Sequence, residues 1–190
     1  VLQGYKKTVF FVLLLSVLLF VLRDFWGMYT ERLTEMIGQG LIDRYIVARY
    51  ISLIGSILLG VSYFLFYYYI VTYIISLITD IPFKRIQKVQ IYVIPTLLLF
   101  NFLEFIIFST IQFVPIFSPF SIAAIVAQFT PNLWVLYFFN QIACSTVITI
   151  LIHYTFLAQW IDEGRKSLLI KLIGVQIFLA AMVATFSTSP

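Results

Sequence analysis

Charged residues are scarce in this chain. Aspartate, glutamate, lysine and arginine make up 11% of its 190 residues, whereas hydrophobic residues make up 62%. A soluble domain carries about 25% charged residues. The segments 50–79 and 105–161 contain no aspartate, glutamate, lysine or arginine. Because about 18 or more apolar residues in a row are typical of a membrane span, the composition predicts a polytopic integral membrane protein surrounded by lipid.

Cysteine and histidine are equally scarce, with Cys144 and His153 the sole examples. A lone cysteine forms no intrachain disulfide, so we interpret Cys144 as a small buried side chain within an apolar run. His153 has no neighbouring cysteine or carboxylate on its own predicted helix, and we expect it to be a hydrogen-bonded histidine rather than a metal ligand. The sequence therefore predicts no metal site and no cofactor.

Recognisable catalytic motifs are missing as well. The sequence contains no H-E-x-x-H, Walker, G-x-G-x-x-G or G-x-S-x-G motif. We therefore expect a protein that is not an enzyme. The net charge of +4 comes from basic residues beside apolar runs, which favours a role in membrane orientation over nucleic-acid binding.

The apolar runs predict an all-α fold, a polytopic transmembrane bundle of about five helices that forms one domain over residues 1–190. We interpret the first run as a retained span rather than a signal peptide, because no small-residue cleavage site follows it. The predicted spans are 8–26, 51–79, 89–112, 132–160 and 168–186.

Two connecting segments differ from ordinary hydrated loops. Segment 29–49 is rich in charge, and its apolar residues recur every three to five positions. This spacing predicts a short amphipathic helix on the membrane surface, although a solvated loop also fits the pattern. Segment 113–131 has no charge and three prolines, which favours a hairpin resting in the membrane interface.

The distribution of basic residues predicts the orientation, because cytoplasmic loops are enriched in lysine and arginine. With five spans, one side carries eight basic residues, namely Lys6, Lys7, Lys84, Arg85, Lys88, Arg165, Lys166 and Lys171. The other side carries four, namely Arg23, Arg32, Arg44 and Arg49. We therefore expect the N-terminus in the cytoplasm and the C-terminus outside it.

Candidate functional residues fall into two sets. Ser52, Ser56 and Gly60 recur every four residues, and small residues at this spacing allow another helix to approach closely. The polar candidates within spans are Asn101, Glu104, Asn140, Gln141 and His153. A carboxylate in a bilayer must be protonated, paired or in water, so Glu104 is either part of a transport path or bonded to Asn101 or to a polar residue of the fourth span.

The order of these parts resembles the Yip-domain family, in particular bacterial YknW-type members. The resemblance rests on five spans, a basic turn at Pro82 to Arg85, and a third span that opens with Tyr92-Val93-Ile94-Pro95. Bacterial members of this family accompany ABC-type exporters, and eukaryotic members act in membrane trafficking through small GTPases. The family has no catalytic site to transfer, so only Pro82, Tyr92 and Pro95 carry over, as a structural signature.

These observations predict an accessory or assembly protein in a bacterial cell membrane. Its expected partners are lipid and other membrane subunits, with an ABC-type exporter as the class that the resemblance implies. An oligomeric transporter or channel with Glu104 in its path is the alternative from another class. A eukaryotic-type trafficking protein and a membrane enzyme are further alternatives.

Overall fold

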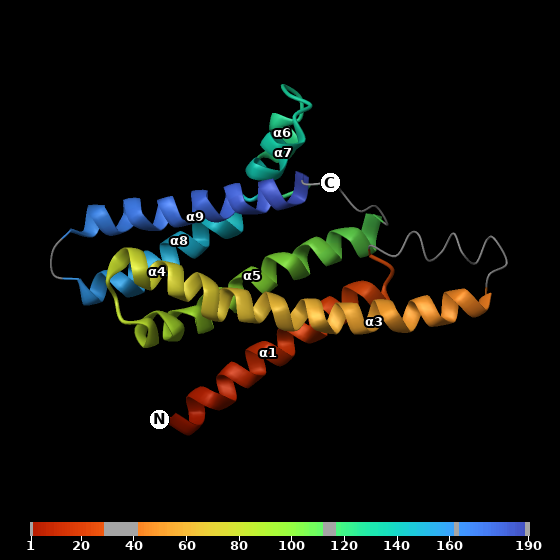
Figure 1. Ribbon diagram of the computed structural model, residues 1–190, viewed down its shortest axis with the longest axis horizontal. Coiled ribbons are helices and arrows are strands. Elements are labelled where there is room, and N and C mark those ends of the chain that lie inside the picture. The colour runs from red at the N-terminus through yellow and green to blue at the C-terminus, as the bar shows by residue number, and fades with distance from the viewer. Residues whose placement is uncertain (1, 29–41, 112–116, 162–163, 189–190) are drawn as a thin grey trace.

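The computed structural model describes residues 2–28, 42–111, 117–161 and 164–188, and the regular elements within these ranges are all helices. The long helices lie side by side along the longest axis of the molecule (Figure 1). Successive helices alternate in direction, so the N-terminus and the C-terminus lie toward opposite ends of the bundle. The prediction of an all-α bundle is confirmed.

Within the part of the chain that the structure describes, four helices are long and apolar enough to cross a membrane. The prediction of a membrane-embedded protein is therefore confirmed at this level. The four segments are Tyr5–Phe25, Tyr45–Thr79, Phe83–Ile111 and Arg165–Thr188. They correspond to α1 (Leu2–Phe25), to the continuous α3, η1 and α4, to α5 (Phe83–Ile111) and to α9 (Arg165–Thr188).

The second long helix begins earlier than the sequence predicts. It comprises α3 (Ile42–Leu65), the π-helix η1 (Phe66–Val71) and α4 (Thr72–Thr79) without a break. Residues 42–49, which we assigned to a separate interfacial helix, form the start of α3, and residues 29–41 lie outside the described residues. The π-helix carries an aromatic run, Phe66-Tyr67-Tyr68-Tyr69, and buries Tyr68 and Val71. Its wider turn shifts the helical register at this point.

The third long helix, α5, also extends further than predicted. The basic residues Lys84 to Lys88 belong to its first turns, and the helix is continuous past Pro95. The carbonyl of Pro82 accepts hydrogen bonds from the backbone N–H groups of Arg85 (2.8 Å) and Ile86 (3.4 Å), so the chain enters α5 directly from the turn. Asp80 ends α4 with a positive φ of 59°. This left-handed residue reverses the chain within a very short connection.

The predicted fourth span, 132–160, is divided in the structure. Residues Leu133–Asn140 form α7, and Cys144–Leu157 form α8, which the 3-10 helix η2 (Ala158–Trp160) extends. Between α7 and α8, Ala143 is extended (φ −113°, ψ 167°) and pairs with Ser121 as an isolated bridge. The N–H of Cys144 donates to the carbonyl of Phe120 at 3.1 Å. This pairing interrupts the helix. As a result, α8 has 14 residues and η2 has three.

The segment before α7 lies partly within the predicted proline-rich hairpin. Residues 112–116 lie outside the described residues, and the rest contains the single-turn helix α6 (Ala123–Val126). Together α6 and α7 project from one side of the long helices in Figure 1. Helix α7 packs against α9. Asn132 caps α7 by accepting a hydrogen bond from the N–H of Val135 at 3.3 Å.

Two apolar clusters hold the bundle together, and α5 contributes to both. One joins α4, α5, α8 and α9 around side chains such as Ile75, Val93 and Leu172. The other joins α1, the end of α3, η1 and α5 around side chains such as Val12, Phe64 and Ile94. Because α5 presents one face to each cluster, it is the central helix of the bundle. It connects α1 and the end of α3 to α4, α8 and α9.

Candidate functional site

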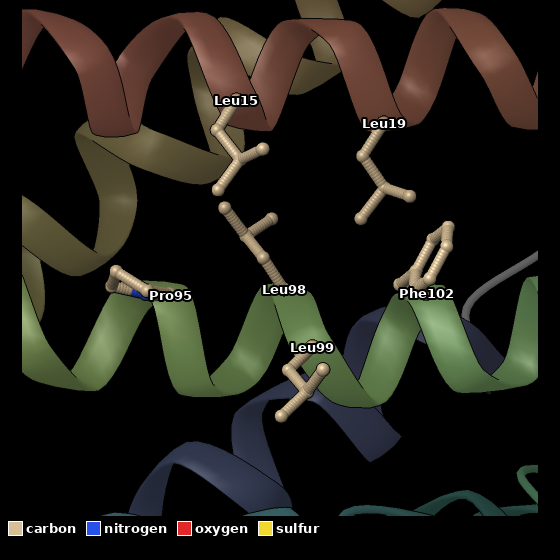
Figure 2. Close-up of a pocket in the computed structure, with 6 residues that line it drawn as sticks. All are labelled: Leu15, Leu19, Pro95, Leu98, Leu99 and Phe102. Atoms are coloured by element: carbon tan, nitrogen blue, oxygen red, sulfur yellow. The ribbon is translucent and has the colours of Figure 1, made fainter.

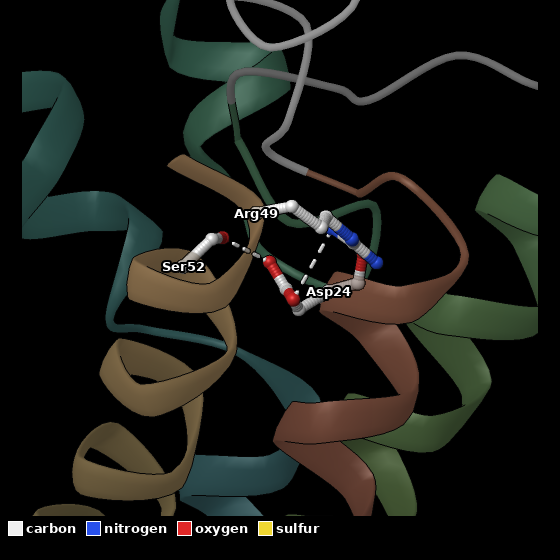
Figure 3. Close-up of polar contacts among 3 residues, drawn as sticks. All are labelled: Asp24, Arg49 and Ser52. Carbon is white, nitrogen blue, oxygen red and sulfur yellow. Dashed lines mark hydrogen bonds and ion pairs between the residues drawn. The ribbon is translucent and has the colours of Figure 1, made fainter. Parts of the chain in front are cut away.

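A cluster of polar and charged side chains forms where α1 ends beside α3 and α5. Asp24, in the last turn of α1, is its centre. Its Oδ1 accepts from Ser52 Oγ at 2.5 Å, and its Oδ2 lies 3.3 Å from Nη1 of Arg49 (Figure 3). Arg49 Nη2 also donates to the backbone carbonyl of Asp24 at 3.0 Å. Asp24 is only 6% exposed, so its carboxylate depends on these partners.

Arg23, the neighbouring residue, is directed toward α5. Its Nη1 donates to Oδ1 of Asn101 at 2.6 Å, and its side chain is 5% exposed. The guanidinium also lies 5.7 Å from the ring centre of Phe20. Asn101 in turn donates from Nδ2 to the carbonyl of Leu97 at 3.0 Å and to the Tyr63 hydroxyl at 3.4 Å. The cluster therefore links three long helices, and it contains one carboxylate, paired with Arg49, and a second guanidinium group, Arg23, bonded to Asn101.

The polar cluster borders a cavity of about 380 Å³ between α1 and α3. Its polar wall consists of Arg23, Asp24, Ser52 and Ser56, and its apolar wall includes Phe20 and Leu59. Arg23 and Asp24 were not among the predicted site residues, because we assigned them to the flank of a span. The adjacent arginine and aspartate at the end of an apolar run could have indicated a polar site, since a carboxylate in that position needs a partner.

Glu104 takes part in a separate network, away from Asn101. Its Oε1 accepts a hydrogen bond from the Ser118 hydroxyl. The N–H of Ser118 donates to Oδ1 of Asn140 at 2.8 Å, and Ser121 Oγ donates to the same atom at 3.1 Å. We expected Glu104 to bond Asn101 or a polar residue of the fourth span, and its partner in the structure is neither of these but Ser118. Glu104 and Asn140 instead share Ser118, which lies in the connection between α5 and α7.

Gln141 lies beside the break that precedes α8. Its backbone carbonyl accepts from Thr146 Oγ1 at 2.6 Å. Gln141 and Gln176 help to line a small cavity of about 50 Å³ next to Phe66 and Tyr67 of the π-helix. A cavity of this size accommodates single water molecules rather than an organic ligand.

His153 is buried in α8 and is 1% exposed. Its Nδ1 lies 2.9 Å from the carbonyl of Thr149 on the same helix, as expected for a hydrogen-bonded histidine. Its Nε2 has no hydrogen-bond partner in the structure, and neither does the side-chain amide of Gln90 on α5. Among the described residues, no group of three or more histidine, cysteine, aspartate or glutamate side chains could hold a metal ion.

The small-residue stripe on α3 lies against α1. A Cβ atom added at Gly60 would lie 2.7 Å from Cα of Val17, so the two backbones are in close contact there. The Ser16 hydroxyl donates to the carbonyl of Gly60 at 2.9 Å. Ser52 binds Asp24, as described above, and Ser56 lines the cavity. The stripe thus has two functions, close helix packing at Gly60 and polar contacts toward Ser52.

Tyr92 and Pro95 of α5 contact different neighbouring helices. The Tyr92 ring stacks on Phe156 of α8 at a centroid distance of 5.1 Å. Pro95 borders an apolar groove of about 270 Å³ between α1 and α5. Figure 2 shows Leu15 and Leu19 of α1 pointing toward Leu98 of α5 across this groove. These residues contribute packing surfaces and no reactive group.

Three comparisons were made between this chain and known proteins. No protein-family model, no curated protein and no solved structure matches the chain. The Yip-domain resemblance of Pro82, Tyr92 and Pro95 therefore stays a prediction.

Proposed function

We propose that this chain is a non-enzymatic accessory or assembly subunit that packs against a larger membrane protein through α3. The observation that carries this proposal is the low burial of α3. In the most apolar part of Tyr45–Thr79, only 11% of the residues are buried within the chain, against 28%, 28% and 33% in the other three long helices. A helix with so few residues buried within the chain must be covered by lipid or by another protein.

The exposed residues of α3 form a continuous apolar stripe. Each member lies three or four positions from another member, which places them on one helical face. They are Val47, Tyr50, Ile51, Ile54 and Leu58, and each is between 58% and 67% exposed. A long, apolar helix face with an aromatic side chain is suited to packing against a second transmembrane helix.

The total surface of the chain supports the same proposal. Its accessible area is 12099 Å² for a mass of 22.0 kDa. A compact monomer of this mass exposes about 9,300 Å² by the usual scaling of surface with mass. The chain thus exposes more surface than a compact soluble monomer of this mass, as expected for a membrane protein whose helices are covered by lipid or by a partner. An ABC-type exporter is the partner class that the Yip resemblance implies, and its subunits are the first candidates to test.

Site-specific photo-crosslinking tests this proposal. A photoreactive amino acid at Ile54 or Leu58 of α3 should yield an adduct with one defined membrane protein in cells, because these side chains face the partner. The matched control is Ile177 of α9, which is 50% exposed and should yield no such adduct. Adducts with lipid alone, or equal protein adducts from α9, would refute the proposal. An adduct at twice the mass of the chain would indicate self-association instead.

A second proposal is a small oligomeric transporter or channel. The observation in its favour is the cavity of about 380 Å³ with Arg23 and Asp24 in its wall. Glu104, the residue that the sequence suggested for a transport path, bonds Ser118 and does not border this cavity. Flux through the purified protein in proteoliposomes, abolished by Asp24→Asn in a protein that still folds, would favour transport over the accessory role.

A further inference from the structure

The starts of α1, α5 and α9 lie at one end of the bundle, and this end is rich in positive charge (Figure 1). The sequence segments that contain these helix starts are 1–7, 80–88 and 162–171, and we refer to them together as the basic end. They contain three acidic residues, Asp80, Asp162 and Glu163. They contain eight basic residues, namely Lys6, Lys7, Lys84, Arg85, Lys88, Arg165, Lys166 and Lys171. With all of these groups ionised, the sequence gives the basic end a surplus of five positive charges.

The basic side chains of this end are not neutralised by the described part of the chain. The ion pair between Arg49 and Asp24 is at the opposite end of α1, and none of the eight side chains is paired with a carboxylate of the described residues. Asp162 and Glu163 lie outside the described residues, and the surplus of five already counts both as negative. Seven of the eight side chains are exposed, and Lys171 is half-buried. The surplus charge is therefore available to an anion outside the chain.

Helix packing brings the start of α5 close to Trp160, which lies a few residues before α9. The Arg85 guanidinium is 5.7 Å from the ring centre of Trp160, the last residue of η2. Ile86 and Leu168, from the first turns of α5 and α9, are buried in the same apolar cluster. A helix N-terminus carries a partial positive charge, and the first turns of both helices contain no acidic residue to offset it. The helix ends therefore add to the charge of the side chains.

These basic residues lie at the level expected for lipid headgroups. Lys88 is the sixth residue of α5 and Lys171 is the seventh of α9, so the charges occupy about 10 Å at the start of each helix. Each headgroup layer of a bilayer is roughly 5–8 Å thick, and long basic side chains extend into it from slightly deeper positions. Trp160 is 37% exposed, as is typical of a tryptophan at the membrane interface. This level favours a lipid headgroup over an acidic protein in the aqueous phase.

We propose that the basic end binds the phosphate groups of anionic phospholipids at the starts of α5 and α9. The contacting side chains are Lys84, Arg85 and Lys88 of α5, together with Arg165 and Lys166 of α9. Basic clusters directly beside a membrane-spanning helix are a known type of anionic-lipid site, and each basic residue contributes a factor of about five to the binding constant. This inference is independent of the accessory function, because α3 does not belong to the basic end.

Trp160 provides a local probe of the bound lipid. With Trp26→Phe and Trp134→Phe, it is the sole tryptophan of the chain. The matched control retains Trp134 instead, through Trp26→Phe and Trp160→Phe. Trp134 is 40% exposed, close to the 37% of Trp160, but its Nε1 donates to Thr185 Oγ1 at 3.2 Å, near the end of α9 rather than its start. The two single-tryptophan proteins therefore report on lipid at opposite ends of the same helix.

The measurement is quenching of tryptophan fluorescence by brominated lipid. The full chain is reconstituted in bilayers of phosphatidylglycerol and phosphatidylcholine at equal mole fractions, with bromine near the headgroup end of the acyl chains of one lipid at a time. At Trp160, phosphatidylglycerol should associate about five times more strongly than phosphatidylcholine. At Trp134, the two lipids should quench equally, because the residue lies away from the basic end.

Paired substitutions of exposed residues assign the binding groups. Lys84→Gln with Lys88→Gln, or Arg165→Gln with Lys166→Gln, should reduce the preference at Trp160 by a factor of about three or more. Arg85 is left unchanged in both, because it contacts the probe. Lys6→Gln with Lys7→Gln is the matched control, since it removes the same charge from α1, which packs on α3 and α5. This pair should retain the preference at Trp160.

The contrary outcomes are equally defined. Equal quenching of Trp160 by the two lipids, or an equal preference for phosphatidylglycerol at Trp134, would overturn the proposal. A preference that survives both pairs of substitutions in α5 and α9, or that the α1 pair reduces as strongly, would overturn it as well. Inorganic phosphate, compared with chloride at the same ionic strength, provides a further arm because it lacks acyl chains. If phosphate alone removes the preference, the site recognises a free phosphate and the lipid assignment is wrong.

Discussion

Arg23 and Asn101 join the end of α1 to α5 through a hydrogen bond of 2.6 Å between Nη1 and Oδ1. The asparagine is held in place by its own helix, because its Nδ2 donates to the carbonyl of Leu97 at 3.0 Å. Its oxygen is therefore presented to the arginine in a fixed orientation. A hydrogen bond to a charged donor in a poorly hydrated environment is among the stronger polar contacts in a protein.

This relationship predicts that Asn101→Leu destabilises the protein by about 1.5–3 kcal/mol, because the buried guanidinium loses its amide partner. The unfolding free energy in mixed micelles, titrated with a denaturing detergent, measures the effect. Thr96→Val on the same helix is the control, since the Thr96 hydroxyl bonds only the carbonyl of Tyr92 in its own helix. If Asn101→Leu were as stable as Thr96→Val, the contact would have no role in holding α1 on α5.

The packing of α1 on α3 leads to a second prediction, for two glycines of one helix. Gly60→Ala should cost roughly 1–3 kcal/mol, because its Cβ would lie 2.7 Å from a backbone atom of Val17 and the helices would have to separate. Gly55→Ala should cause no loss, since its Cβ position is open. The same unfolding assay compares them. Equal stability of the two variants would mean that the close approach at Gly60 does not exist in the membrane.

The sequence predicted the long helices well, because a long apolar run has few structures open to it in lipid. The ends of these helices were less predictable. Residues 42–49 are charged and were assigned to a separate helix, yet they continue α3 without a break. The interruption between α7 and α8 depends on Ser121 and Phe120 pairing with Ala143 and Cys144, which is a contact between segments that no local pattern reveals.

The candidate site was also only partly predictable from the sequence. Asn101 and Glu104 are one helical turn apart, and we expected Glu104 to bond either Asn101 or a polar residue of the fourth span. Their actual partners, Arg23 and Ser118, are on other segments of the chain. The hydropathy pattern identified polar residues that need partners, whereas the choice of partner depended on which helices pack together. For this reason the charged cluster around Asp24 emerged only from the structure.

The contact between Glu104 and Ser118 predicts the effects of two substitutions. Glu104→Gln should be nearly silent in stability, because a glutamine oxygen can still accept from the serine hydroxyl. Glu104→Leu should cost about 1–2 kcal/mol, because Ser118 then loses its acceptor. A double-mutant cycle with Ser118→Ala isolates the pair. If Glu104→Leu costs the same in the Ser118→Ala background, the two side chains are not coupled and Glu104 has a different partner.

The arrangement of turns predicts the topology of the chain. The first residues of α5 and of α9 lie at the same end of the bundle as the start of α1 (Figure 1). Cysteines introduced at Lys84 and Arg165, in a Cys144→Ser background, should therefore be labelled from one side of the membrane. A cysteine at Ser187 should be labelled from the other side. The basic residues of the first end lead us to expect that side to be cytoplasmic. Labelling of all three sites from one side would contradict both the five-pass path and the orientation.

The last prediction concerns Gln90, a fully buried amide on α5. Its exposed fraction is 0%, and neither its oxygen nor its nitrogen has a hydrogen-bond partner in the structure. Its neighbours in sequence, Val89 and Val93, belong to the apolar cluster between α5 and the C-terminal helices. An unpaired buried amide costs free energy, so Gln90→Leu, which is similar in size, should leave stability unchanged or raise it by about 1 kcal/mol. The substitution Val93→Gln is the converse control and should destabilise, because it places a second amide in the same apolar cluster. A loss of stability in Gln90→Leu comparable to that in Val93→Gln would show that the native amide has a partner in the membrane. The first partner to test, by a double substitution, is His153 on the adjacent helix α8, whose Nε2 also has no hydrogen-bond partner in the structure.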